Sequence, residues 1–498
     1  HRSLGAKPRQ NGRANAARPL REGSPMTLHA RLTEEIRSAP AGPKVGAFFD
    51  LDQTLLAGFS AGAFMRERLL SGRMSPREML ESTAGVVGFK LGRVGFSGFV
   101  ASATAAYRGL AERTLEEIGE EVFEKHLATR IYPEARALVR AHQERGHTLA
   151  VVSSATRYQV DPFARALGIE HVLCTRLEVQ DGVFTGRVVR PTCYGDGKAR
   201  AAATFASGHD VSLAQSYFYT DAYEDLPLLE AVGRPRPLNP DRRLAQLAKE
   251  RRWPVRRFHS RGTPSLADWL RTGLVYGSLG PATAAGATAG LVNGSWREAI
   301  NTTGSIWGEL ATSFAGVDLR VEGEEHLWSH RPAVFIFNHQ SALDAVLMLK
   351  MLRRDFTGIG KKEIRRHPLF GPLFSAAGMV FVDRADPGRA IEALEPAVRA
   401  LHEGRSIVIA PEGTRSLTPR PGPFKKGAFH LAMQAGVPIV PVVFRNVLDA
   451  LPKDAVVVRP ATIEAVVLPP VETAGWTRDR LGDEIRKVRE AYLRVLEG

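Results

Sequence analysis

Two stretches of the chain alternate short apolar runs with longer mixed segments, which is typical of a parallel sheet covered by helices. Polar or charged residues follow most of these runs, and α/β sheets carry their chemistry at the carboxyl ends of the strands. The pattern therefore predicts two α/β domains, each with a site at one edge of its sheet. The strand-like runs are 45–49, 148–152 and 217–219 in the first stretch, and 333–337, 379–382, 406–410 and 437–444 in the second.

Three further segments have a readable pattern. Residues 57–130 contain few β-branched runs and predict a mostly helical insert between the first two strands. Residues 177–183 predict a hairpin that turns at Asp181-Gly182. Residues 478–496 predict an amphipathic helix whose charges form a solvated face.

The segment between the two domains carries no charged residue from 272 to 296. A bilayer crossing needs about 20 apolar residues, so the length would allow one. Glycine and alanine dominate, however, and Gly280-Pro281 interrupts the middle. Leu266, Trp269 and Leu274 fall on one helical face just before. We expect two short helices that meet at Gly280-Pro281 and dip into one leaflet; a buried helical pair between the domains is the alternative.

Composition and net charge limit the kinds of binding partner and the cellular compartment that we expect for this chain. The 498 residues are enough for two or three domains, and the formal net charge of +14 favours an anionic partner, either a membrane surface or nucleic acid. The two cysteines form no metal-binding or redox pair, which is typical of a reducing, cytoplasmic compartment. Residues 1–40 are expected to form a basic disordered tail without a secretory signal, and Met26 is an alternative start.

An acidic pair, Asp50 and Asp52, follows the first strand-like run. One carboxylate could attack phosphorus while the other handles the proton of the leaving oxygen. Such a site needs a cation, and Mg²⁺ prefers oxygen ligands. By itself the pair could be a polar turn, but further polar groups follow later strands and loops. These are the hydroxyl of Ser153, the ammonium of Lys198 and the carboxylates of Asp221 and Asp225.

In this order the motifs resemble the haloacid dehalogenase-like phosphatases, in their phosphoserine-phosphatase-like branch (subfamily IB), over 44–255. The resemblance implies a Rossmann-like parallel sheet with a helical cap at about 57–130. It implies that Asp50 is the phosphorylated nucleophile and that Asp52 is the general acid and base. The remaining implied roles are phosphate binding by Thr54, Ser153 and Lys198, and an Mg²⁺ site formed by Asp50, Asp52 (through its carbonyl), Asp221 and, from a second layer, Asp225.

One departure from that family concerns the substrate. Phosphoserine phosphatases carry an acid shortly after the nucleophile motif to receive the substrate amine. The corresponding stretch here, 57–60, is Ala-Gly-Phe-Ser and has no acid. We therefore expect a more apolar monoester, and the apolar and basic stretch 86–100 suits a lipid phosphate as well as simple packing.

The second site is indicated by His339 and Asp344, which follow the strand-like run 333–337. An imidazole is a natural general base near neutral pH, and a carboxylate on its second nitrogen would fix the tautomer. No serine or cysteine stands at a recognisable nucleophile turn, so we expect direct transfer rather than a covalent acyl-enzyme. The alternative for these residues alone is a helix cap at Asn338 beside a surface histidine.

Basic and acidic residues follow the later strands of this half. Arg384 comes after 379–382, and the sequence Glu412-Gly-Thr-Arg415-Ser comes after 406–410. Arginines at strand ends are suited to bidentate phosphate binding. Lys361 and Lys426 add positive charge nearby in the sequence.

These three motifs, together with the apolar strand Val437-Pro-Ile-Val-Pro441 that follows them, resemble the glycerophospholipid acyltransferase family over about 260–470, with its domain at 301–498. The resemblance implies that His339, oriented by Asp344, takes the proton of an acceptor hydroxyl as it attacks the thioester of acyl-CoA or acyl-carrier protein. It implies a membrane-binding helical hairpin at 256–300. The implied binding residues are Arg384, Arg415 and Lys361 for the acceptor phosphate, and Asn338, Glu412, Gly413 and Thr414 for the pocket.

Together the two resemblances predict a fused enzyme that converts lysophosphatidate to phosphatidate and carries a Mg²⁺-dependent phosphatase domain. We expect it on an anionic phospholipid membrane, peripheral or monotopic on the cytoplasmic face. Two alternatives stay open: a phosphatase-like domain that is only a scaffold or regulator, and glycerol 3-phosphate as the acceptor. No nucleic-acid-binding motif is found, so no nucleic acid is expected. The oligomeric state is left open.

Overall fold

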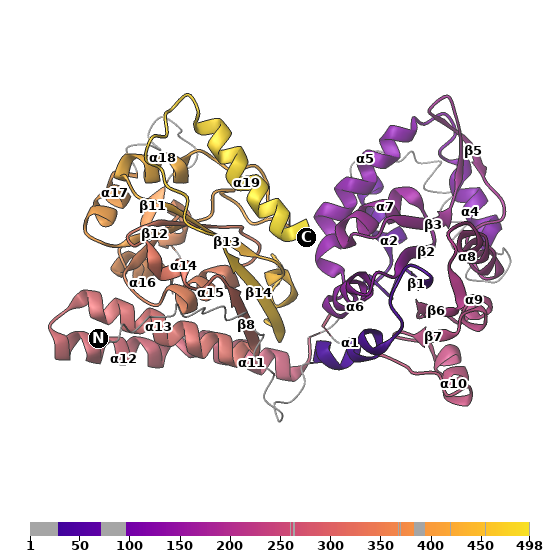
Figure 1. Cartoon of the computed structure of the whole chain (residues 1–498), viewed down its shortest axis with the longest axis horizontal. Helices are drawn as coiled ribbons and strands as arrows, with labels where there is room; N and C mark the ends of the chain where they lie inside the picture. Colours follow the sequence, from indigo (N-terminus) through magenta and orange to yellow (C-terminus); the bar gives the residue numbers. More distant parts are fainter. Residues whose placement is uncertain are drawn as a thin grey trace, which may run out of the picture.

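The structure is a computed structural model. It describes residues 28–70, 96–258, 260–261, 264–366, 368, 370–382, 394–418, 420–453 and 455–497. Two lobes lie next to each other in Figure 1, and each is built around its own sheet.

The first lobe contains the predicted phosphatase-like domain. Its elements in chain order are α1 (Leu28–Ser38), β1 (Val45–Phe49), α2 (Ser60–Leu70), α4 (Phe96–Ala105), α5 (Glu112–Val122), η1 (Phe123–Leu127), η2 (Ala128–Arg130), α6 (Pro133–Glu144), β2 (Thr148–Thr156), α7 (Arg157–Leu167), β3 (His171–Thr175), β4 (Leu177–Gln180), β5 (Val183–Val188), α8 (Asp196–Gly208), β6 (Ser212–Thr220), η3 (Tyr223–Asp225), α9 (Leu226–Ala231), β7 (Arg234–Pro237) and α10 (Arg242–Glu250).

Its sheet has the order β3-β2-β1-β6-β7, and all neighbouring strands are parallel. The central strand β1 is buried on both faces because alternate side chains enter different layers: Ala47 and Phe49 pack toward α5, α6 and α7, and Phe48 packs toward α8 and α9. The three predicted strands are confirmed, and β4 and β5 form the predicted hairpin around Asp181-Gly182.

The amino-terminal prediction is wrong in part. Residues 28–38, which fall inside the predicted disordered tail, form α1. Ile36 is buried in the core of the first domain, and Glu35 pairs with Arg236 of β7. The helix is therefore part of the domain, while residues 1–27 lie outside the described part of the chain.

A chain of hydrogen bonds connects two buried histidines under this sheet. The Nε2 atom of His147 lies 2.8 Å from the Pro40 carbonyl, to which it must donate. Its Nδ1 atom therefore accepts from Nδ1 of His142 at 2.7 Å, and Nε2 of His142 accepts from the Tyr219 hydroxyl at 2.9 Å. Two neutral imidazoles satisfy this chain with one proton each, and a second proton on His147 would place its Nδ1–H against the Nδ1–H of His142.

This arrangement predicts a loss of stability at acidic pH. Burial, with smaller effects from His147 and nearby arginines, holds the pKa of His142 well below its usual value. Below pH 6.5 the unfolded chain therefore binds a proton at His142 that the folded chain does not bind. The free energy of unfolding is thus highest above pH 6.5 and falls below it, by about 1.4 kcal/mol per pH unit for His142. We expect urea unfolding of the first domain at pH 7.5 and 5.5 to show this slope. In His142→Gln, which cannot titrate, an unchanged slope would contradict the assignment.

The second lobe contains the predicted acyltransferase domain and the segment before it. Its elements are α11 (Leu266–Gly277), α12 (Leu279–Asn293), α13 (Trp296–Ala315), β8 (Val317–Glu322), α14 (His326–Ser329), β9 (Val334–Phe337), α15 (Leu343–Leu352), β10 (Phe356–Lys361), η4 (Lys362–Arg366), α16 (Phe370–Ala376), β11 (Val380–Val382), α17 (Glu395–His402), β12 (Ser406–Ile409), α18 (Gly427–Ala435), β13 (Ile439–Phe444), η6 (Val447–Asp449), β14 (Ala461–Val467) and α19 (Leu481–Glu497).

Its seven strands have the order β11-β10-β12-β9-β13-β14-β8, and only β13 and β14 run antiparallel. The central strand β9 again divides its side chains between two layers: Phe335 and Phe337 face α13 and α15, and Val334 and Ile336 face α17, α18 and α19. The four predicted strands of this half and the carboxyl-terminal helix are confirmed.

The helices before this sheet differ from the prediction. Ser278, between α11 and α12, keeps right-handed helical torsion angles, so the two helices run on from each other. Gly280-Pro281 lies in the first turn of α12, where a missing proline N–H costs no hydrogen bond. The chain reverses instead at Gly294, with φ of 61°, and α13 returns against α12. The predicted turn at Gly280-Pro281 is therefore wrong, and α13 crosses the predicted boundary at residue 300.

The outer face of α11 and α12 is apolar and exposed. It consists of Leu266, Trp269, Leu270, Leu274, Leu291 and Val292, whose exposed fractions run from 53% to 85%. In Figure 1, α12 lies along the lower edge of the lobe, with α13 between it and the sheet. Among the described residues, none of the helices combines the length and hydropathy that a bilayer-spanning segment requires.

An arginine just before α11 joins the two lobes. Arg261 donates to the Thr129 carbonyl of the first domain at 2.9 Å and to the Leu448 and Asp449 carbonyls of the second at 3.0 and 3.1 Å. Nearby, Arg140 of α6 pairs with Glu464 of β14 at 2.9 Å. These contacts fix the orientation of the first domain relative to the second.

Candidate active sites

Two predicted acids and the predicted lysine of the first domain meet at the carboxyl edge of its sheet. Nζ of Lys198 donates to Asp50 at 2.8 Å and to Asp225 at 2.7 Å, and all three side chains are buried. Thr220, at the end of β6, also donates to Asp225 at 2.6 Å. Although burial opposes the ammonium ion, Asp225 and Asp50 raise the pKa of Lys198. The site therefore holds a permanent positive charge beside the Asp50 carboxylate.

The second carboxylate of the motif faces a helix terminus. Asp52 accepts from the main-chain N–H of Ser60 at 2.7 Å and from the Ser60 hydroxyl at 3.2 Å. After Asp52 the chain turns at Gln53, whose φ is 60°, before it enters helix α2. Asn239 fixes this turn by donating a hydrogen bond to the Gln53 carbonyl at 2.9 Å. Burial raises the pKa of Asp52, which favours its holding a proton for transfer.

The other predicted phosphate-binding groups are also buried. The hydroxyl oxygen of Ser153, in β2, accepts from the N–H of Ala155 at 3.2 Å. The Thr54 hydroxyl is buried without a hydrogen-bond partner among the described residues, so it is available to a bound group.

Two carboxylates have the properties expected of a cation site. Burial raises the pKa of Asp50 to about 7 against the pull of Lys198. Burial and the charge of Asp50 raise the pKa of Asp221 to about 8. A divalent cation between them would remove this mutual penalty. No metal-competent group of three or more His, Cys, Asp or Glu side chains exists in the described part of the chain, so main-chain oxygens or water would complete the shell.

The predicted pair of the second domain is formed directly after β9. Nδ1 of His339 lies 2.8 Å from Oδ2 of Asp344, which also accepts from the main-chain N–H groups of Gln340 and Ser341 at 2.7 and 2.8 Å. Three donors to one oxygen require an ionised carboxylate and a proton on Nδ1 of His339. Burial raises the pKa of Asp344, and the bond from His339 opposes that shift. Nε2 of His339 is left as the proton acceptor.

The main chain around His339 is held from both sides. Asn338 exchanges two hydrogen bonds with Phe444 at the end of β13, at 2.7 and 2.8 Å. The His339 N–H donates to Glu412 at 2.8 Å, and the other oxygen of Glu412 accepts from the N–H of Gly422 at 2.8 Å. Glu412 therefore connects the loop that carries His339 to the loop that contains Gly422.

The predicted phosphate-binding residues are only partly brought together. Arg415 lies in the loop whose Ser416 N–H donates to the His339 carbonyl at 2.6 Å, and it donates to the Lys453 carbonyl at 2.6 Å. Gly413 in the same loop has φ of 75°, and Thr414 is exposed. Lys361 is exposed at the end of β10. Arg384 lies outside the described residues.

Two residues of α19 support this site and were missed in the sequence. Arg489 donates to the carbonyls of Gly422 and Pro421, both at 3.0 Å, on the loop that holds Glu412. Tyr492, one turn later and fully buried, donates to the Ile336 carbonyl at 2.7 Å. The prediction that the charges of this helix only face solvent is wrong at Arg489. The spacing of three residues between Arg489 and Tyr492, which puts them on the same face of the helix, was the sequence signal that could have indicated this role.

We expect Arg489→Ala to lower kcat of the acyl transfer predicted for the second domain about ten- to a hundredfold, because small displacements of a catalytic base are costly. The KM for the acyl donor should change little, since Arg489 acts through the Glu412 loop. Arg489→Lys should recover part of the rate. Arg486→Ala, which removes an exposed arginine of the same helix, is the matched control. Equal kcat values in the two alanine variants would contradict this role.

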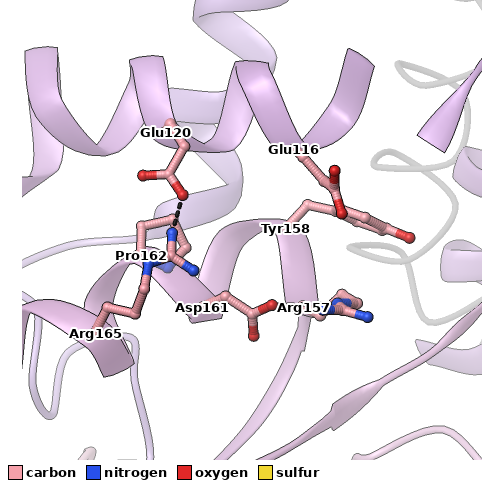
Figure 2. A pocket seen from close by; sticks show the side chains of 7 residues that line it. All are labelled: Glu116, Glu120, Arg157, Tyr158, Asp161, Pro162 and Arg165. Atoms are coloured by element: carbon pink, nitrogen blue, oxygen red, sulfur yellow. Dashed lines mark hydrogen bonds and ion pairs between the residues drawn. The ribbon is translucent and has the colours of Figure 1, made fainter. Parts of the chain in front are cut away.

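A charged groove of about 460 Å³ lies between α5 and α7, apart from the predicted site residues. Figure 2 shows Arg165 paired with Glu120 across it, and Arg157 pairs with Asp161 at 3.2 Å. The two helices can approach closely because Gly119 has no side chain. A Cβ at this position would lie 2.0 Å from the Tyr158 carbonyl oxygen. Four of its five charged residues form ion pairs within the groove, so it has no uniform charge with which to select a ligand.

The two cysteines take part in neither site. Both thiols are free, with Cys193 buried and Cys174 half-buried. Burial raises the pKa of each thiol to about 12, so neither is a reactive thiolate.

Comparisons with known proteins separate along the same two lobes. Residues 47–230 match the haloacid dehalogenase-like hydrolase family and residues 318–445 match the acyltransferase family. A 1-acyl-sn-glycerol-3-phosphate acyltransferase of Limnanthes douglasii is 36% identical over 197 residues, 39% of this chain and 69% of the relative.

Two bacterial proteins match the first lobe. A phosphoserine phosphatase of Mycobacterium tuberculosis is 33% identical over 226 residues, 45% of this chain and 73% of the relative. An inhibition of morphological differentiation protein of Streptomyces azureus is 34% identical over 259 residues, 50% of this chain and 92% of the relative. The chain therefore belongs to two families at once, the haloacid dehalogenase-like hydrolases through its first domain and the 1-acyl-sn-glycerol-3-phosphate acyltransferases through its second.

Proposed function

We propose that the second domain transfers an acyl chain from acyl-CoA or acyl-carrier protein to the free hydroxyl of lysophosphatidate. The observation that carries this is the His339–Asp344 pair, with Nδ1 bonded to a buried carboxylate and Nε2 available. Nε2 takes the hydroxyl proton as the oxygen attacks the thioester carbonyl, and the thiolate of the donor leaves with a proton. Arg415, Lys361 and Arg384 are the proposed partners of the acceptor phosphate.

We propose that the first domain hydrolyses a phosphate monoester. Asp50 attacks phosphorus while Asp52 protonates the leaving oxygen, and water then cleaves the aspartyl phosphate with Asp52 as the base. Lys198, Ser153 and Thr54 surround the phosphate oxygens. Asp50 and Asp221, with the Asp52 carbonyl, would hold Mg²⁺, which supplies charge neutralisation when bound. Asp225 supports this arrangement by fixing Lys198.

We infer that the monoester is apolar. The residue before Ser60, which orients Asp52, is Phe59, and its side chain is 64% exposed. The leaving group would meet an aromatic ring here rather than a carboxylate able to bind an amine. Phosphatidate, the product of the second domain, and lysophosphatidate, its substrate, both fit this description.

We propose that the exposed apolar face of α11 and α12 enters one leaflet of an anionic membrane. A row of leucines with a tryptophan, exposed in the free protein, suits the interface of a bilayer. A peripheral or monotopic position on the cytoplasmic face follows, and it would bring the second site to its lipid acceptor.

Product assays test this function. CoA release should require lysophosphatidate and proceed much more slowly with glycerol 3-phosphate; a preference for glycerol 3-phosphate would overturn the acceptor assignment. Phosphate release should be faster from phosphatidate or lysophosphatidate than from phosphoserine. Release from none of these or other monoesters would favour a scaffold role for the first domain.

Metal removal should separate the two activities. We expect a chelator to abolish phosphate release and added Mg²⁺ to restore it, because the Asp50 and Asp221 charges need a counterion. CoA release should be unaffected, since no described group of the second domain requires a metal. Phosphate release that survives chelation would contradict the proposed cation site.

A further inference from the structure

A strongly basic segment links the first domain to α11. Residues 242–257 contain seven basic residues and one acid, so they carry a net charge of +6 out of +14 for the whole chain. No part of either proposed site uses these residues. The basic residues are Arg242, Arg243, Lys249, Arg251, Arg252, Arg256 and Arg257.

The fold turns most of this charge outward. Leu244 and Ala248 bury one side of α10, so Arg242 and Lys249 are exposed on the other, as is Arg257 beyond the helix. Among the described contacts, two of the seven side chains interact with the rest of the domain. Arg243 stacks 4.1 Å over the Tyr223 ring, and Arg251 pairs with Glu230 at 2.8 Å.

Helix α10, with which the basic segment begins, and helices α11 and α12 lie along the same edge of the molecule. Figure 1 shows α10 at the lower edge of one lobe and α11 and α12 at the lower edge of the other. The contacts of Arg261 with both domains hold this arrangement. One flat surface could therefore contact the exposed apolar face of α11 and α12 and the basic segment 242–257 at the same time.

We propose that the basic segment 242–257 binds the head groups of anionic phospholipids and so holds the first domain on the membrane that α11 and α12 enter. This inference rests on the proposed membrane association of those helices. A cation within a Debye length of an anionic bilayer contributes about 1 kcal/mol, so several acting together bind firmly. A bilayer fits better than nucleic acid because helices α11 and α12, which lie at that edge, expose leucines and a tryptophan.

The consequence is a substrate route for the first domain. A phosphatase held on the bilayer surface meets monoester lipids at high local concentration, and the product of the second domain is released into that same surface. Soluble monoesters gain nothing from this position. The basic segment thus selects the lipid class of substrate through location.

Vesicle sedimentation of the full chain tests the proposal. Arg242→Gln/Lys249→Gln/Arg257→Gln is compared with the control Arg176→Gln/Arg187→Gln/Arg190→Gln, which removes three exposed charges beside the β4–β5 hairpin. With vesicles of phosphatidylcholine and phosphatidylglycerol, we expect the first variant to bind at least about tenfold more weakly than the control. On phosphatidylcholine alone the two should bind equally.

Other outcomes separate the proposal from its premise. Leu270→Ser/Leu274→Ser should weaken binding to both kinds of vesicle. Wild type that binds neither would overturn the membrane association itself. Wild type that binds anionic vesicles, with the two charge variants indistinguishable, would overturn the role of the basic segment. Tighter binding of the wild type to duplex DNA than to anionic vesicles, lost only in the first variant, would assign the segment to nucleic acid instead.

Discussion

Replacing His339 with alanine is expected to lower CoA release from acyl-CoA and lysophosphatidate about a thousandfold, within the range that a general base contributes. The physical reason is that Asp344 fixes the tautomer of this ring, and its Nε2 has no hydrogen-bond partner among the described residues. Steady-state assays of thiol release measure it directly. Asp344→Asn should lose less, because the amide keeps the shape of the site while weakening its hold on Nδ1.

Two controls belong to this experiment. His402→Ala removes an exposed histidine of α17 and should leave CoA release unchanged. Phosphate release from a suitable monoester should be normal in His339→Ala, which shows that the first domain is intact, and an unchanged circular dichroism spectrum checks the fold of the second. CoA release at the wild-type rate in His339→Ala would contradict the assignment of His339 as the general base.

The Asp50→Asn variant is expected to lose phosphate release by on the order of a thousandfold or more, because the amide cannot form the aspartyl phosphate. Asparagine keeps nearly the same volume and can still accept from Lys198, so the buried cluster should remain folded. Single-turnover assays with a monoester lipid check this result.

The matched control for Asp50→Asn is Asp181→Asn, which changes the exposed turn of the β4–β5 hairpin. It should keep full phosphate release. CoA release should be normal in both variants. Phosphate release at the wild-type rate in Asp50→Asn would mean that another group is the nucleophile.

Local patterns correctly predicted that Asp50 and His339 lie at the ends of buried strands. Asp50 and His339 each follow a fully buried strand, and such strands are conspicuous as continuous apolar runs. Mixed or short strands were missed, as in β8, where Val317 and Leu319 alternate with charged residues at the sheet edge. Edge strands bury less, so their sequences carry less signal.

Contacts between distant parts of the chain could not be predicted. The bond of Asn338 to Phe444 spans 106 residues, and that of Arg489 to Gly422 spans 67. Proline misled the prediction for a different reason. A proline breaks a helix only when it lies in the helix interior. Pro281 lies in the first turn of α12 because the junction between α11 and α12 is at Ser278, and the position of this junction depends on packing against α13.

The central claim is that one chain carries two independent sites that act on the same lipid. Labelled lysophosphatidate supplied with acyl-CoA and Mg²⁺ tests it most directly, by separation of the products. Phosphatidate should accumulate with Asp50→Asn, monoacylglycerol should be the main labelled product with His339→Ala, and both phosphate release and acylation should occur in the wild type. A single variant that abolishes both activities while the protein stays folded, or a wild type that never releases phosphate from either lipid, would contradict the claim.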